Sequence, residues 1–253
     1  MSRTPQAVLL VALALAAGAD AARAQGRPLD DGELSATWGQ ALLDLTNTSL
    51  NGYEFSRITL NADINLSTTM TGLKLGTHGV DGVPGSDIDI ARLSFGRSDA
   101  GDAKRTVLIN NPYFEWVYTG TAGSADRQVV GMRLGFQGLS GDVGMTMNSV
   151  SGALSMDTGN GIASLDGKRQ DTLTCASGCT TVALPSVGGV TTTATSTDFF
   201  LSVLKSAVTY PAVLPGGATA AQAQAGFWLN WTNNLKALNT TGLVPPNIPK
   251  TGP

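Results

Sequence analysis

The chain has 253 residues, of which 16 are Lys or Arg and 19 are Asp or Glu, so its formal net charge at pH 7 is −3. Charged residues make up only 14% of the sequence. This balance excludes a basic surface of the kind that binds nucleic acid, and it does not favour electrostatic binding to anionic lipid, because both need clustered positive charge.

The first 24 residues have the features of a secretory signal peptide. Arg3 supplies a short positive region, residues 7–17 form an unbroken apolar core, and Ala22–Ala24 is a small-x-small cleavage site. Cleavage after Ala24, with Ala21 as the alternative, predicts export to the periplasm, the outer membrane or the cell surface. We expect one domain over residues 25–242, followed by a proline-rich tail over residues 243–253.

The stretch from Arg57 to Leu75 alternates between apolar and polar residues with a period of two. The even positions carry Ile58, Leu60, Ala62, Ile64, Leu66 and Met70, and the odd positions carry Thr59, Asn61, Asp63, Asn65, Ser67 and Thr69. Only an extended strand uses this period, because its successive side chains point to opposite faces. The pattern predicts a strand over residues 58–70, roughly 40 Å long, with its apolar side in the core.

A second alternating region covers residues 129–156. The same face is expected to carry Val130, Met132, Leu134 and Phe136, opposite Gly131, Arg133, Gly135 and Gln137. The phase then changes several times at glycine or other small residues, which indicates successive strands joined by tight turns and bulges. Apolar packing in a strand core is the expected role of Met132, Met145, Met147 and Met156, rather than copper binding.

Together these patterns predict an all-β fold. The expected architecture is a single elongated domain, built as an antiparallel sheet, a sandwich or a β-roll-like stack of long alternating strands, with minor helix near the termini. Short helical turns are expected within residues 28–45 and 218–225. Residues 226–238 suit a strand or a helix equally.

The two cysteines, Cys175 and Cys179, lie in the segment TCASGCTT. In an exported chain, an even number of closely spaced cysteines indicates a disulfide. Three residues separate them, where a redox C-x-x-C motif has two, and a metal site would need further Cys or His ligands. We expect a structural disulfide that staples a hairpin or loop.

The sequence offers little for catalysis, so we expect no enzyme. A hydrolase with a Ser or Cys nucleophile needs an imidazole as a proton shuttle, and His78, in a glycine-rich loop, is the only histidine. Paired carboxylates would suit a glycosidase, but no spacing distinguishes any pair among Asp87, Asp89, Glu54, Glu115 and Asp142.

Two weaker binding hypotheses remain, and no cofactor is expected beyond them. The segment GVDGVPGSDID supplies Asp81, Asp87 and Asp89 with glycine-rich backbone carbonyls, which suits Ca²⁺, although ordinary turn chemistry explains the same acids. Phe227, Trp228 and Trp231 suit either a carbohydrate-stacking platform or a core.

Six segments carry a family pattern: PLDDGELSATWGQ (28–40), EFSRITLNADINLSTTMTGLKLG (54–76), GSDIDIARLSFG (85–96), NNPYFEWVY (110–118), DRQVVGMRLGFQGLSGDVGMTM (126–147) and TDFFLSV (197–203). They resemble a family of Gram-negative exported β-rich proteins, some of which are labelled pilus-assembly proteins of the Fil type. The resemblance implies an exported surface role and supplies no catalytic residues.

The interpretation is therefore a non-enzymatic structural or interaction protein of the cell surface or periplasm, related to pilus assembly or adhesion. Its expected partners are proteins of the cell envelope, and its oligomeric state is open. One alternative is a small outer-membrane β-barrel, in which Ile58, Leu60 and Ile64 would face lipid. A second alternative is a secreted glycan-binding module or hydrolase.

Overall fold

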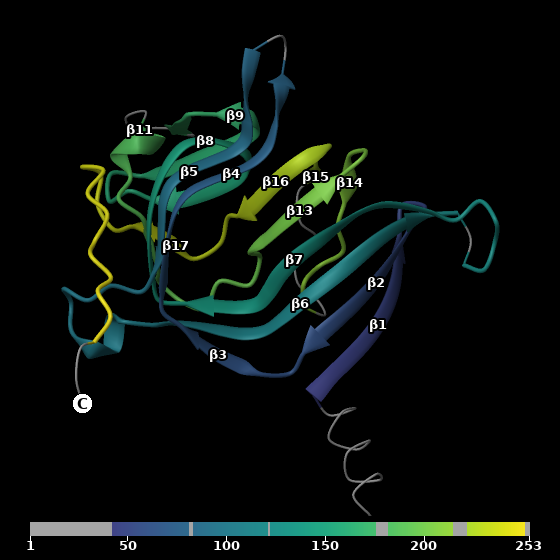
Figure 1. The fold of residues 1–253 in the computed structure, drawn as a ribbon, viewed down its shortest axis with the longest axis horizontal. Helices are drawn as coiled ribbons and strands as arrows, with labels where there is room; N and C mark the ends of the chain where they lie inside the picture. Colours follow the sequence, from purple (N-terminus) through teal and green to yellow (C-terminus); the bar gives the residue numbers. More distant parts are fainter. Residues whose placement is uncertain (1–41, 81–82, 121, 176–181, 215–221, 251–253) are drawn as a thin grey trace, which may run out of the picture. The chain divides into compact units, whose positions relative to one another are not determined.

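The computed structural model describes residues 42–80, 83–120, 122–175, 182–214 and 222–250 (Figure 1). These described residues belong to one compact unit. Nearly all of its regular secondary structure is strand, which confirms the predicted all-β fold. Its other regular elements are two short 3-10 turns, η1 (Asp102–Lys104) and η2 (Leu184–Ser186).

The strands, in chain order, are β1 (Leu43–Leu50), β2 (Tyr53–Leu60), β3 (Asp63–Leu66), β4 (Thr68–Val80), β5 (Val83–Phe95), β6 (Val107–Thr119), β7 (Gln128–Ser140), β8 (Asp142–Asp157), β9 (Ile162–Gln170), β10 (Thr172–Cys175), β11 (Val182–Ala183), β12 (Val190–Thr192), β13 (Phe200–Leu204), β14 (Val208–Thr209), β15 (Gln222–Ala223), β16 (Gly226–Trp231) and β17 (Leu235–Ala237). The helix expected over residues 218–225 is wrong at Gln222–Ala223, which pairs with β14. Residues 226–238 contain two strands, β16 and β17, and no helix.

Fifteen strands join one mixed sheet, whose main path is β1-β2-β6-β7-β13-β16-β8-β9-β10-β11. The long strand β8 is the branch point, because it also pairs with β5, β12 and β17. Most pairings are antiparallel, as expected, but β16 and β17 run parallel to β8. β5 carries β4 on its other side (Figure 1).

The strand expected over residues 58–70 is divided into three. β2 and β3 both pair with β6, and a bulge separates them where the Asn111 N–H donates to the Ala62 carbonyl. Asn111 has φ 45°, a left-handed conformation that asparagine tolerates. After Ser67 the chain leaves β6, and β4 pairs with β5 instead. The alternation therefore continues through a change of partner strand.

The alternating faces exist, but the expectation of which face is buried is wrong in β2 and β7. Arg57 and Thr59 are buried, whereas Ile58 and Leu60 are only half-buried. In β7, Arg133 is completely buried, while Met132 is 38% exposed and Leu134 is 48% exposed. The reason is that residues 205–214 cover the polar face, and their carbonyls accept hydrogen bonds from Arg57 and Arg133.

The largest apolar core lies around β5, β8 and β9. It includes Met145, Met147 and Met156, so the core role predicted for these three methionines is confirmed, while that for Met132 is wrong. A smaller core contains Phe55, Phe200, Tyr210 and Trp228, and it lies on the buried polar face beside the arginines. The described unit thus has two cores, one on each side of the sheet.

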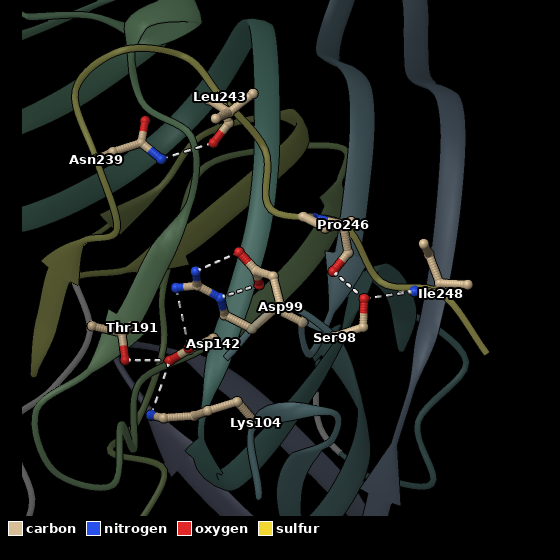
Figure 2. A network of polar contacts seen from close by, with 10 residues as sticks. Ser98, Asp99, Lys104, Asp142, Thr191, Asn239, Leu243, Pro246 and Ile248 are labelled. Carbon is tan, nitrogen blue, oxygen red and sulfur yellow. Dashed lines mark hydrogen bonds and ion pairs between the residues drawn. The ribbon is translucent and has the colours of Figure 1, made fainter. Parts of the chain in front are cut away.

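The proline-rich tail is extended and bonded to the loop after β5. Ser98 Oγ donates to the Pro246 carbonyl (3.0 Å) and accepts the Ile248 N–H (3.2 Å), as Figure 2 shows. The Ser98 N–H donates to the same Pro246 carbonyl at 2.7 Å. Asn247 Nδ2 donates to the Phe95 carbonyl at 2.8 Å. The tail therefore acts as a strap that closes the end of β5.

Beneath the strap, Asp142 is the buried anchor of a polar network. It accepts hydrogen bonds from Thr191 (2.6 Å) and Lys104 (3.3 Å), and Arg97 lies 3.8 Å away (Figure 2). Near the end of the strap, Arg105 and Lys250 hold the pKa of Asp102 below its usual value. A carboxyl group with a lowered pKa in the folded state stabilises the fold. This stabilisation by Asp102 is present above the ordinary carboxyl pKa, and it is lost as the pH falls through the lower pKa of the folded state.

We expect Asn247→Ala to lower the free energy of unfolding by about 1 kcal/mol, because it removes the hydrogen bond from the side-chain amide to the Phe95 carbonyl. Urea unfolding measures the change, and amide hydrogen exchange at Ser98 should become faster. Lys250→Ala, which removes only an exposed ion pair, serves as the control and should change the stability by less than about 0.5 kcal/mol. Equal effects of the two variants on stability would contradict the claim that the strap holds the end of β5.

Candidate functional site

The outer face of the sheet carries a transverse row of apolar side chains, which we call the outer row. Residues directly opposite each other on antiparallel strands point to the same face. The register therefore aligns six positions across β1, β2, β6, β7, β13 and β16: Leu45, Ile58, Phe114, Leu134, Leu201 and Leu229. A shorter row beside it contains Trp116, Met132, Val203 and Phe227.

The outer row is covered at one end and open at the other. Leu201 and Leu229 line an apolar cavity of ≈ 80 Å³ with side chains of β4, β5 and β8, which fold over this end. Toward β1 the cover is absent within the described residues, and Leu45 is 67% exposed. Between them, Phe114 and Trp116 pack edge to face at 4.3 Å between ring centroids. Contiguous exposed apolar surface of this kind is typical of an interaction site.

The strand at the open end, β1, has an unpaired edge in the described part of the chain. The Leu42 carbonyl accepts the Asn61 N–H. The even-numbered residues of β1 therefore form the backbone hydrogen bonds to β2. In an antiparallel ladder the intervening residues point their backbone groups the other way. Leu43, Leu45 and Asn47 therefore direct their N–H and C=O groups to the open edge.

The opposite face of the same strands holds a buried ion cluster. Glu115 accepts the Arg57 Nε–H on one oxygen and the Arg133 Nε–H on the other, each at 2.7 Å. Tyr113 lies under the Arg57 guanidinium, and Tyr210 lies under that of Arg133 (4.3 and 4.2 Å to the ring centroids). Burial raises the pKa of both tyrosines, against the effect of the nearby guanidinium groups.

This cluster is structural in its geometry. Both carboxylate oxygens of Glu115 are engaged by guanidinium groups, so Glu115 is a poor candidate for a general acid. A hollow of ≈ 430 Å³ beside it is lined by Asp44, Arg57, Glu115, Gln137, the threonines of β1 and β2 on this face, and residues 211–214. The remaining acids considered for catalysis are apart: Glu54 pairs with Arg127, and Asp142 belongs to the network under the strap.

The three acids suggested for calcium are not shown as one site. Asp81 lies outside the described residues. Asp87 is buried and accepts the Phe227 N–H (2.9 Å), whereas Asp89 pairs with Lys74 (3.4 Å) and Asn148 (3.0 Å). Among the residues that the structure describes, no group of three or more His, Cys, Asp or Glu side chains is placed to hold a metal. The calcium hypothesis stays a prediction.

Other predicted positions are placed only in part. The backbone of His78 pairs with Gly85 in the β4–β5 hairpin rather than lying in a loop. Cys175 ends β10, and Cys179 lies outside the described residues, so the disulfide also stays a prediction. Trp228 and Trp231 are buried, and Trp231 Nε1 donates to Ser196. Their rings therefore belong to the core and are not open to a sugar.

No protein-family model, curated protein or solved structure matches the chain. Across the described ranges, no helix has the length and apolar character needed to cross a membrane. The candidate site accordingly rests on the geometry alone. Of its residues, Ile58 and Leu134 were expected in the core, and their exposure is what the sequence analysis missed. Leu45 and Phe114 were assigned to neither face.

Proposed function

We propose that the chain is a non-enzymatic structural or interaction protein of the cell envelope, exported to the periplasm or cell surface, in a role related to pilus assembly or adhesion. The observation that carries the proposal is the outer row, whose open end exposes Leu45 and Leu134 by 67% and 48%. Apolar side chains aligned over neighbouring strands suit a protein partner that packs on the sheet.

The charge distribution supports the same role. The charged groups of the central strands, Arg57, Glu115 and Arg133, lie on the inner face and are paired with one another. The outer row therefore offers apolar contact without the cost of burying an unpaired charge. Export is supported by the N-terminal sequence pattern, and the pilus relation is supported by the family resemblance.

The test is site-specific photo-crosslinking in the native cell. A photoreactive amino acid is placed at Leu134, and the tagged chain is followed through cell fractionation. Leu243 is the matched control, because it is apolar and 72% exposed but lies outside the outer row. We expect a discrete protein adduct from position 134, in the envelope fraction, and no such adduct from position 243.

Three results would contradict the proposal. One is a tagged chain that remains in the cytoplasm. Another is an identical set of adducts from positions 134 and 243, which would show that the outer row has no specific partner. The third is an adduct at position 134 with lipid alone, which would favour the membrane-inserted alternative.

A further inference from the structure

We propose that β1 pairs with β1 of a second copy of this chain, antiparallel, about a two-fold axis that passes beside Leu45. The inference rests on the interaction role proposed above and names one partner for it. It is carried by the backbone groups, the side chains and the charge of β1. Apart from Leu45, the outer row stays free in such a dimer, because the two sheets join edge to edge.

The backbone of β1 is complementary to itself in this register. An axis at Leu45 places Leu43 opposite Asn47 of the second copy and Leu45 opposite its own counterpart. All of these residues direct their N–H and C=O groups to the open edge, since the even residues bond to β2. Each pair therefore exchanges two hydrogen bonds, as in a regular antiparallel ladder.

The side chains agree with the same register. Leu45 meets Leu45 of the second copy, so the outer rows of the two sheets become continuous through Ile58 on each side. On the other face, Asp44 lies opposite Thr46, and no like charges meet. An axis moved to Asn47 would place Leu45 opposite Ser49 and would lose the leucine pair.

The other outermost strands of the described sheet are poorer edges for pairing. β3 and β11 have only four and two residues, and short edge strands resist association. β4 is longer but is irregular. It carries Lys74, whose side chain is 60% exposed, and two of its glycines, Gly72 and Gly76, have φ 67° and 65°. Lysine and local backbone irregularity are the features that protect natural edge strands from association. β1 has neither Lys nor Pro nor Gly over its eight residues. The unprotected edge is therefore β1.

Engineered cysteines test the register directly, in the full chain with Cys175 and Cys179 replaced by serine. Opposed residues in a hydrogen-bonded pair have Cα atoms about 5.5 Å apart, within disulfide reach. We expect Leu45→Cys to give a covalent dimer on mild oxidation. Leu43→Cys alone should not, because its two copies are displaced by about 14 Å along the strands, but it should cross-link when mixed with Asn47→Cys.

Sedimentation velocity of the purified chain tests the association without cross-linking. Leu45→Lys places two ammonium groups against each other and should weaken the dimer on the order of 100-fold, since both leucine contacts are lost. Thr48→Lys adds the same charge to the same strand away from the axis and is the matched control. A dimer that tolerates Leu45→Lys, equal cross-linking of Leu43→Cys and Leu45→Cys, or a wild-type chain that stays monomeric would overturn the proposal.

The two proposals fail separately. The two-fold axis at β1 leaves Leu134, three strands away, out of contact with the second copy. If Leu45→Lys leaves the photo-adduct at position 134 unchanged and the wild type is monomeric, the self-pairing is wrong and the envelope interaction stands. If the cysteine pattern appears but position 134 gives no protein adduct, the chain pairs with itself and the wider interaction role fails.

Discussion

Glu115→Gln should lower the free energy of unfolding by about 3–5 kcal/mol, the largest effect that we expect from a single polar substitution in this chain. The carboxylate is 1% exposed and holds two guanidinium groups, one of which, Arg133, is completely buried. The neutral amide of the substituted side chain cannot balance the charge of either guanidinium. Its NH₂ group would also face a guanidinium N–H, so that two hydrogen-bond donors would meet. Urea unfolding followed by tryptophan fluorescence measures the change.

The control for this substitution is Glu54→Gln. Glu54 pairs with Arg127 at 3.3 Å, but both side chains are about a third exposed, so water replaces the lost interaction. A loss of no more than about 1 kcal/mol is expected. A third variant, with Arg57→Met, Glu115→Leu and Arg133→Met together, should recover much of the stability. If Glu115→Gln and Glu54→Gln cost the same, the cluster does not stabilise the fold as described.

Trp228→Ala should cost about 3–5 kcal/mol, since it opens a large cavity in the smaller core. The Trp228 ring is fully buried among Phe200, Tyr210 and Val130, and it contacts no solvent. Trp116→Ala is the comparison, because Trp116 is only half-buried on the outer face. It should cost clearly less while weakening the photo-adduct at position 134.

The Trp228→Ala variant also separates the glycan-binding alternative from the interaction role. A sugar platform at Trp228 would lose binding upon its removal while the thermal midpoint stays unchanged. Because Trp228 is buried in the smaller core, we expect the opposite: a large drop in the thermal midpoint that accompanies any loss of glycan binding. Thermal unfolding and a glycan array, run on the same Trp228→Ala preparation, distinguish these outcomes.

The strands and their alternation were predictable because the period of two is visible in the sequence as alternating apolar and polar residues. The alternation at Ile58 and Leu60, and at Met132 and Leu134, predicted extended chain in β2 and β7, although the bounds of β2 were not predicted. The face that is buried was not predictable, because it depends on contacts from far along the chain. Residues 205–214 cover Arg57 and Arg133, while β4 and β5 cover only one end of the apolar face.

One local signal of the inverted face was present in β7. Gly131 and Gly135 flank Arg133 on alternate positions, and glycine within a strand often marks a close approach of other groups. A Cβ at Gly135 would lie 2.4 Å from the Tyr113 hydroxyl, and one at Gly131 would lie 2.2 Å from the Val203 carbonyl. Glycines that alternate with leucine and methionine thus indicated crowding on their own side of the strand.

The candidate site was less predictable than the strands. Leu45 lies at the end of residues 28–45, where the sequence predicted a short helical turn and no strand, and nothing local shows that its strand ends the sheet. The edge arises because β2 turns back onto β6 and leaves β1 with one neighbour. Such a position is a property of the topology, so only the three-dimensional arrangement identifies it.

The pairing of β8 has a consequence for how the chain reaches its native state. Strand β8 ends at Asp157, yet two of the strands that complete its edge, β16 and β17, begin at Gly226 and Leu235. Contacts so distant in sequence make the contact order high, and folding on a scale of about milliseconds to seconds follows. Since β16 and β17 are synthesised well after β8, the centre of the sheet stays incomplete until both strands have been made.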